Sequence, residues 1–375
     1  ILMIMADQWT AWASGAYGHQ VVKTPNLDAL AAKGAVFDSF YCNSPLCAPA
    51  RFTFMAGRQA SAIGAYDNAS EFTSATPTMA HYLRAMGYQT CLSGKMHFIG
   101  ADQLHGFEER LTTDIYPADF GWTVNWDAPE ERIDWWYHNM LSVKQAGVAE
   151  ITNQLEFDDE VGSESVAKLY DLARGKDDRP FFLCTSFTHP HDPYACRRKY
   201  WDMYDPAEID LPRDGETATD PHSQRILKAV DMERFDLTED DIRNARRAYY
   251  GNITYVDEWI GRLMAVLDET GLRENTIVIV TSDHGDMLGE KGLWYKMNYY
   301  EGAARIPLVV SAPGLVEPQR VANNCSHVDV LPTLLDLAAT TAGDRAPAPV
   351  TELDGRSLLP LMTGSGADDA DELTS

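Results

Sequence analysis

The chain has 375 residues, and its 31 Lys and Arg against 56 Asp and Glu give a formal net charge of −25. This length suffices for one large domain or two modest ones. So negative a surface disfavours proteins that bind nucleic acid or anionic membranes. The apolar run Ile1–Ala6 is too short to span a bilayer. Six cysteines without a Cys-x-x-Cys pair favour reduced thiols and a cytoplasmic location.

Short apolar segments alternate along the chain with longer segments of helical periodicity. In chain order we expect a strand at Ile1–Ala6, helices at Asn26–Lys33, Thr78–Met86 and Ser163–Ala173, a strand at Phe181–Thr188, a long helix within Thr238–Glu269, and strands at Thr276–Thr281 and Leu308–Ser311. The continuous apolar character of the strands is typical of strands buried on both faces. The pattern therefore predicts an α/β fold in which helices cover both faces of a mostly parallel central sheet.

The same pattern predicts the domain organisation. Residues 1–341 are expected to form one α/β domain, and residues 342–375 a linker followed by a small acidic tail. Within the domain, residues 107–152 are rich in Trp, Tyr and Asp and have little periodicity. We expect them to form a long excursion from the sheet that carries a binding site.

Acidic residues directly follow two of the predicted strands. Asp7-Gln8 follows the first strand, and Asp283-His284 follows the strand that begins at Thr276. Ligands of open α/β sheets bind at the carboxyl ends of strands. Two carboxylates brought together there repel each other unless a hard cation lies between them, which favours a Ca²⁺, Mg²⁺ or Mn²⁺ site. The alternative is that each aspartate only caps the turn behind it.

A third signal is the segment Cys47-Ala-Pro-Ala-Arg51. Proline is typical of the first turn of a helix, so Pro49 places Cys47 at a helix N-terminus. The helix dipole there favours an anion or a nucleophile with a lowered pKa. A cysteine in this position can equally be a small apolar core residue.

Together these motifs resemble those of type I sulfatases, the formylglycine-dependent members of the alkaline phosphatase superfamily. Cys47-x-Pro49-x-Arg51 resembles their signature, and the order of the other motifs matches as well, namely Asp7-Gln8, Gly94–His97, Pro190–Pro193, Ser282–Gly285 and Lys296. Longer segments are similar to choline sulfatases, namely Asn43–Arg51, Tyr66–Ala69, His105–Trp122, Ile133–Asn139 and Gly285–Met297. The resemblance covers nearly the whole chain.

The resemblance implies hydrolysis of choline-O-sulfate to choline and sulfate through a sulfo-enzyme intermediate on formylglycine, which dedicated machinery generates from Cys47. It also implies a divalent metal, Ca²⁺ ahead of Mg²⁺ or Mn²⁺, held by Asp7, Gln8, Asp283, His284 and the modified Cys47. Many sulfatases have Asp in place of Gln8 and Asn in place of His284. These departures lower the charge of the ligand set and leave the identity of the cation open.

The resemblance also implies roles for several other polar residues. Lys95 and Lys296 would bind the sulfate oxygens, and Arg51 would hold the nucleophile. His191 would protonate the leaving oxygen, and His97 would remove a proton so that sulfate is expelled. Because Lys95 and His97 are two residues apart, an extended segment would direct both to the same side. Each of these side chains can alternatively be an ordinary hydrogen-bonded residue.

The aromatic excursion is where we expect the substrate's quaternary ammonium group to bind, because aromatic faces attract such cations and Trp does so best. Trp122 and His138 are the expected choline-binding residues, and Trp136 is a further candidate. Asn68 is expected to add a hydrogen bond to the sulfate. The alternative is that most of these rings form a satellite hydrophobic core.

Two other functions stay open: a phosphonate monoester or phosphodiester hydrolase of the same superfamily, and a non-catalytic binder of quaternary ammonium compounds. The resemblance further implies a homodimer or homotetramer and a role in osmoprotection or sulfur scavenging. The negative charge of the chain predicts no nucleic-acid or membrane partner. It also implies a C-terminal subdomain beyond Asp354–Leu361, so residues 342–375 are expected to include the start of a truncated C-terminal region.

Overall fold

The computed structural model describes residues 1–375 except 124, 126, 129–137, 214–215, 343–347 and 365–375. Eight strands form the central sheet in the order β10-β2-β9-β8-β1-β6-β3-β4. They are β1 (Leu2–Asp7), β2 (Ala35–Tyr41), β3 (Gln89–Gly94), β4 (Glu109–Arg110), β6 (Phe181–Pro190), β8 (Val278–Ser282), β9 (Leu308–Ser311) and β10 (Gln319–Ser326). Only β9 runs antiparallel to its neighbours in this sheet, which confirms the predicted mostly parallel sheet. A separate two-stranded sheet pairs β5 (Gly147–Val148) with β7 (Ala195–Cys196).

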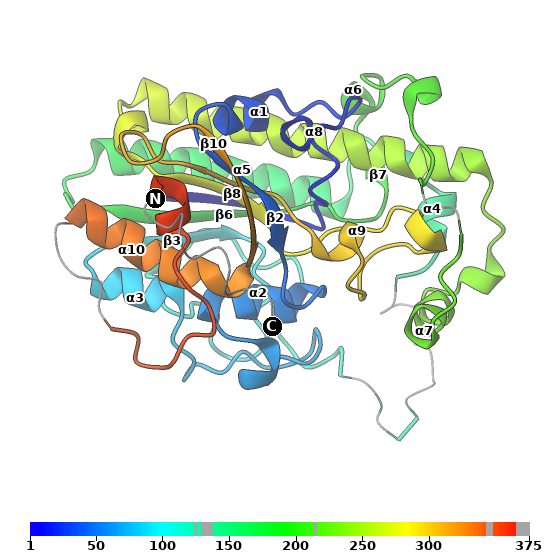
Figure 1. The fold of residues 1–375 in the computed structure, drawn as a ribbon, viewed down its shortest axis with the longest axis horizontal. Coiled ribbons are helices and arrows are strands. Elements are labelled where there is room, and N and C mark those ends of the chain that lie inside the picture. Colours follow the sequence, from blue (N-terminus) through cyan, green and yellow to red (C-terminus); the bar gives the residue numbers. More distant parts are fainter. Residues whose placement is uncertain (124, 126, 129–137, 214–215, 343–347, 365–375) are drawn as a thin grey trace.

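Helices cover both faces of the central sheet, as predicted (Figure 1). One face carries α1 (Pro25–Ala31), α5 (Asn153–Arg174) and α8 (Glu239–Glu269), and the other carries α2 (Cys47–Ala56), α3 (Met79–Ala85) and α10 (Val330–Ala342). Successive side chains of a strand point to opposite faces. Leu2 and Ile4 of β1 therefore join the core of the first set of helices, and Met3 and Met5 join the core of the second.

Local sequence signals set the ends of the long helices. Thr238 caps α8 with a capping box whose other member is Asp241, as the acidic start of this segment predicts. Helix α5 starts ten residues before the predicted Ser163, because Thr152 accepts the backbone N–H of Leu155 at 3.1 Å and caps it. The shorter helices are α4 (Leu141–Lys144), α6 (Arg198–Trp201), α7 (Pro221–Ala229), α9 (Glu301–Ala304) and α11 (Leu359–Thr363).

The described part of the C-terminal segment packs against the larger domain. Leu358 and Met362 are buried in the core beneath α2, α3 and α10. The backbone N–H of Leu358 donates to the hydroxyl of Thr333 at 2.8 Å. The predicted division of the chain at residue 341 stays a prediction.

The six cysteines all lie in described segments, where they are buried and unpaired. This agrees with reduced thiols rather than a disulfide framework. Among the helices in the described ranges, none combines the length and the apolar character that crossing a bilayer requires.

Candidate active site

Two neighbouring parallel strands bring the predicted acidic turns together. Ala6 of β1 pairs with Ser282 of β8, so Asp7 and Asp283 stand next to each other at the carboxyl ends of these strands. The backbone N–H of Gln8 donates to Oδ1 of Asp283 at 3.0 Å, and Gln8 has a left-handed φ of 67°. Both carboxylates are fully buried.

Cys47 lies at the N-terminus of α2, as Pro49 in the first turn predicts. Its Sγ is 3.2 Å from Nε2 of His284 and 4.0 Å from Oδ1 of Asp7. Burial opposes a thiolate, but the positive charges of Lys296 and Lys95 outweigh it and hold the pKa of Cys47 well below that of a free thiol. The predicted nucleophile therefore sits in an electropositive pocket beside the acidic pair.

The donor set around Cys47 fits a hard divalent cation. One possible donor atom from each of Asp7, Cys47, Asp283 and His284 lies within 4.8 Å of the others, and all four residues are buried. Nδ1 of His284 faces the carbonyl of Gly285 at 3.1 Å, so this nitrogen carries the hydrogen and Nε2 points at the cluster. Burial, together with the charge of Asp7, raises the pKa of Asp283. A bound cation would stabilise the ionised form of this carboxylate.

Arg51 connects both carboxylates to the rest of the centre. Its guanidinium donates to Oδ2 of Asp283 and to Oδ2 of Asp7, each at 2.9 Å. It also donates to the backbone carbonyl of Lys95 at 2.6 Å and to the hydroxyl of Ser186 at 2.9 Å. Burial would raise the pKa of Asp7, but nearby cations that include Lys95 and Arg51 hold it below its usual value.

Lys296 and His191 meet next to Gln8. Nζ of Lys296 donates to Oε1 of Gln8 at 2.5 Å and lies 2.8 Å from Nε2 of His191. Nδ1 of His191 lies 2.7 Å from the backbone carbonyl of Asp192, so Nδ1 donates there and Nε2 faces the lysine. The predicted acid and its neighbouring lysine are therefore in contact. The Gln8 side chain binds Lys296, and its role as a metal ligand stays a prediction.

Lys95 directly follows β3, and its side chain extends to the carboxylate of Asp7. Its ammonium forms an ion pair with Asp7 and lies 4.3 Å from the ring centroid of Tyr116. The next two backbone N–H groups, of Met96 and His97, donate to Oδ2 of Asp114 at 2.9 and 2.8 Å. Asp114 thus fixes the loop that carries both predicted catalytic residues.

His97 reaches the site by a different backbone path from the predicted one. Its φ of 58° is left-handed, so the expectation of an extended segment through Lys95 and His97 is wrong. The ring packs against Tyr116 and Trp122, with centroids 5.0 and 5.2 Å away. Among the described residues, neither ring nitrogen has a hydrogen-bond partner. Because no hydrogen bond to another described residue occupies its nitrogens, the His97 imidazole is available for proton transfer.

One cavity of about 400 Å³ opens onto these groups. Its lining includes Cys47, Asn68, His97, Tyr116, Trp122, His138, His191, Asp192 and Lys296. Nδ1 of His138 lies 3.0 Å from Oδ2 of Asp192, and its ring stacks on Tyr295 with the centroids 4.5 Å apart. Burial lowers the pKa of His138 to about 4. The predicted substrate-binding residues thus share a cavity with the predicted catalytic residues.

Asn68 and Trp136 are the two remaining residues predicted to bind the substrate. Oδ1 of Asn68 accepts the backbone N–H of Ala48 at 3.0 Å, so this residue also caps the first turn of α2. Trp136, together with Trp126, Trp135 and Tyr137, lies outside the described residues.

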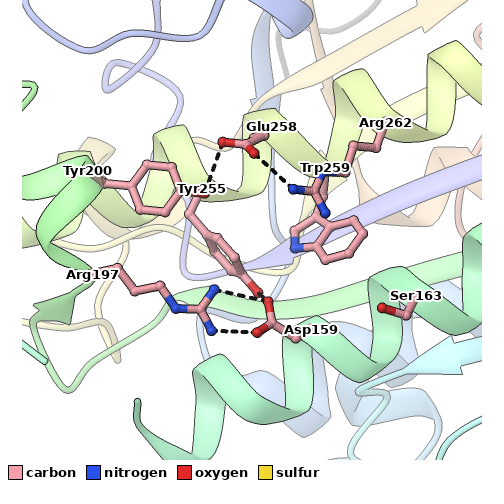
Figure 2. Close-up of a pocket in the computed structure, with 8 residues that line it drawn as sticks. All are labelled: Asp159, Ser163, Arg197, Tyr200, Tyr255, Glu258, Trp259 and Arg262. Atoms are coloured by element: carbon pink, nitrogen blue, oxygen red, sulfur yellow. Dashed lines mark hydrogen bonds and ion pairs between the residues drawn. The ribbon is translucent and has the colours of Figure 1, made fainter. Parts of the chain in front are cut away.

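A second cavity, of about 300 Å³, lies between α5, α6 and α8 (Figure 2). Arg197 pairs there with Asp159, and Arg262 pairs with Glu258 (Figure 2). Because its charged groups neutralise one another, this cavity offers no free charge to a ligand. None of the predicted site residues lines it.

Sequence reasoning missed several residues that hold the site in place. Asp114 and Tyr116 lie within His105–Trp122, a segment that is similar to choline sulfatases over its whole length. That long similarity was the signal that could have identified them. Asp192 and Asp286 belong to motifs that were recognised without being assigned a role. Ser186, inside an apolar strand, gave no signal.

The chain is similar over nearly its full length to known proteins. A family model described as Sulfatase matches residues 1–340. The chain is 52% identical to a choline-sulfatase of Rhizobium meliloti, over 97% of this chain and 71% of that protein. It is 30% identical to the multifunctional alkaline phosphatase superfamily protein PehA of Trinickia caryophylli, over 96% of this chain and 76% of that protein. Among solved structures, a phosphonate monoester hydrolase of Agrobacterium radiobacter superposes with a TM-score of 0.77 at 26% identity, over 97% of this chain and 77% of that one.

Proposed function

The chain belongs to the sulfatase family, and we propose that this sulfatase hydrolyses choline-O-sulfate to choline and sulfate. The similarity to the Rhizobium meliloti enzyme supports this substrate. The structural observation that carries the proposal is the shared cavity, which Cys47 and Lys296 line together with Trp122 and His138. A sulfate ester with a quaternary ammonium end needs a nucleophile and a cation for its sulfate, and aromatic rings for its ammonium group, in one site.

The family generally uses a formylglycine and a divalent metal. We propose that Cys47 is the modified residue and that it binds the ion together with Asp7, Gln8, Asp283 and His284. When present, the two groups supply a hydroxyl nucleophile and the positive charge that lowers its pKa. We propose Ca²⁺ because oxygen donors dominate this set, with Mg²⁺ or Mn²⁺ as the alternatives that metal analysis would identify.

Buried cations surround the place where the sulfate group would lie. Lys95 is held by Asp7, and Lys296 by the carbonyl of Gln8. Ammonium groups fixed in a buried site stabilise negative charge without reorganising during the reaction. We propose that both lysines bind sulfate oxygens, while Arg51 keeps Asp7 and Asp283 in place.

Two separate histidines are available for the two proton transfers. Lys296 holds a proton 2.8 Å from Nε2 of His191, so this pair can deliver a proton to the leaving oxygen. His97 has ring nitrogens without a hydrogen-bond partner among the described residues and lines the same cavity, so it can accept a proton from the modified Cys47 side chain. We propose His191, assisted by Lys296, as the acid and His97 as the base.

The aromatic wall of the cavity suits the ammonium end of the substrate. Trp122 is partly exposed, and its ring packs on Tyr116 with the centroids 5.0 Å apart. Cations bind aromatic faces with about 0.5–2 kcal/mol. We propose that Trp122 and His138 bind the trimethylammonium group and that Asn68 contacts the sulfate.

The test is a comparison of substrates on the purified chain. We expect turnover of choline-O-sulfate to exceed that of an aryl phosphonate monoester by at least about 100-fold. The peptide that contains Cys47 should be lighter by about 18 Da, the change from thiol to aldehyde. Faster turnover of the phosphonate would favour the alternative hydrolase. An unmodified Cys47, or full activity in Cys47→Ala, would contradict the mechanism.

We further propose a cytoplasmic enzyme that assembles as a homodimer or homotetramer and receives its formylglycine from dedicated machinery. The unpaired cysteines support the reducing compartment. Light scattering of the purified chain tests the assembly, and a monomer at micromolar concentration would contradict it.

A further inference from the structure

Asp286 is a fully buried carboxylate that follows the metal-binding turn after β8. Its Oδ1 accepts the backbone N–H groups of Leu288 and Tyr295 at 2.9 and 3.0 Å. Its Oδ2 accepts Nε2 of Gln8 and the hydroxyl of Tyr194, both at 2.7 Å. All four partners donate, so the site requires a group that only accepts, as an ionised carboxylate does.

This hydrogen-bond pattern fixes the orientation of the Gln8 amide. An amide has a donor NH₂ group and an acceptor oxygen, which lie on different sides of the same planar carbon. The NH₂ end donates to Asp286 at 2.7 Å and more weakly to Oδ1 of Asp192 at 3.5 Å, so the carbonyl oxygen of Gln8 faces away from Asp286 and accepts Nζ of Lys296 at 2.5 Å. Were the amide reversed, its NH₂ group would face the ammonium of Lys296, and two donors would oppose each other.

We propose that Asp286 is a positioning residue of the sulfatase centre, which acts by holding the Gln8 amide so that its carbonyl oxygen faces Lys296 and the metal-binding cluster. Lys296 is thereby kept 2.8 Å from His191. This inference rests on the role proposed above for Lys296 at the leaving oxygen. It adds a role for a buried acid that does not line the cavity and that contacts Gln8 through the amide nitrogen, not through the oxygen expected to bind the metal.

The test inverts the polarity of the pair. Asp286→Asn places an NH₂ group or a weaker acceptor against Gln8, and we expect kcat to fall about 10- to 100-fold, the factor for a lost hydrogen bond to a charged group. The double variant Gln8→Glu with Asp286→Asn restores the match, because the new amide donates to one Glu oxygen while the other accepts Lys296. It also keeps the net charge. Because Gln8 is itself a proposed metal ligand, the readout for this variant is the position of Lys296, and we expect Nζ of Lys296 to return to residue 8 and to His191.

Tyr194→Phe is the matched control, since it removes the other donor on the same carboxylate oxygen and leaves the Gln8 amide in place. Its kcat should stay within about threefold of wild type. Crystal structures give a readout independent of activity: Nζ of Lys296 should move away from residue 8 in Asp286→Asn and return in the double variant.

Several outcomes would overturn the inference. These are wild-type kcat in Asp286→Asn, an unmoved Lys296, an equal loss in Tyr194→Phe, or a double variant in which Lys296 stays away from residue 8. If Asp286→Asn does not fold, the double variant decides, and a Lys296 that does not contact residue 8 and His191 there refutes the role. If the wild-type chain does not hydrolyse choline-O-sulfate, the proposed substrate is wrong, whereas the position of Lys296 still tests Asp286.

Discussion

Substitution of Arg51 by lysine tests the buried ion-pair network most directly. Arg51 is fully buried, and its guanidinium donates to the two carboxylates of the centre, to the backbone of Lys95 and to Ser186. Lysine keeps the charge but has a single nitrogen and no planar fork. An ammonium at this position cannot reach both carboxylates and the carbonyl at once, so at least one buried acid loses its partner.

The size of the effect follows from burial. Breaking a buried pair while leaving one charge uncompensated costs about 3–5 kcal/mol. The unfolding entropy of about 2.1 cal/mol/K per residue, taken over the 375 residues of this chain, amounts to about 0.8 kcal/mol/K. We therefore expect Arg51→Lys to lower Tm by about 4 to 6 °C.

Differential scanning calorimetry measures this change, with and without added Ca²⁺. The matched control is Arg174→Lys, because the Arg174 side chain is 74% exposed and pairs with Asp171 at the surface. Surface pairs contribute about 0–1 kcal/mol, so Tm of the control should change by no more than about 1 °C. If Arg51→Lys shifts Tm no more than the control does, the buried network does not stabilise the fold as argued.

Three further predictions concern the substrate, the metal and pH. Trp122→Ala should raise KM for choline-O-sulfate about 2- to 30-fold, equivalent to about 0.5–2 kcal/mol. The control Phe120→Ala, at an exposed neighbouring ring, should leave KM unchanged. Equal KM values for the two variants in steady-state kinetics would exclude Trp122 from substrate binding. An ion present at 100 times its Kd stabilises the folded state by about 2.7 kcal/mol, so its removal by EDTA should lower Tm by about 3 °C. An unchanged Tm would contradict the metal site. Burial lowers the pKa of His327 to about 3, so the unfolded chain protonates first and stability falls by up to about 1.4 kcal/mol per pH unit below pH 6.5. His327→Gln should lose less stability than wild type between pH 6 and 4.5 in urea titrations, and parallel losses would refute this contribution.

The predictable features of the fold were those with a local cause. Strands that are buried on both faces are continuous apolar runs, and such runs marked β1, β6, β8 and β9. The strands that pattern analysis did not locate include β2 and β10, whose sequences mix polar and apolar residues. β10 lies at the edge of the sheet, where only alternate residues are covered, so its apolar pattern is weak.

The site shows the same division between local and long-range causes. Asp7, Cys47 and Asp283 could be found from the sequence because Asp7 ends β1, Cys47 begins α2 and Asp283 directly follows β8. The partner of the Gln8 amide could not be found in this way, since Asp286 lies 278 residues further along the chain. Nor could the left-handed turn at His97, which depends on the bonds that Asp114 makes with the backbone of the preceding loop.

The charges at the centre explain how an acidic protein can bind an anionic ester. The whole chain carries a net charge of −25, but three buried cations face three buried carboxylates at the site, namely Arg51, Lys95, Lys296, Asp7, Asp283 and Asp286. Because these charges balance, a divalent ion would leave the centre positive, while surface charges more than about 10 Å away are screened by salt. The proposed substrate is a zwitterion, whose sulfate would contact this positive centre while its ammonium end contacts Trp122. A sulfate ester with a neutral tail would gain from the first interaction only, so this arrangement favours choline-O-sulfate over sulfate esters that have neutral tails of the same size.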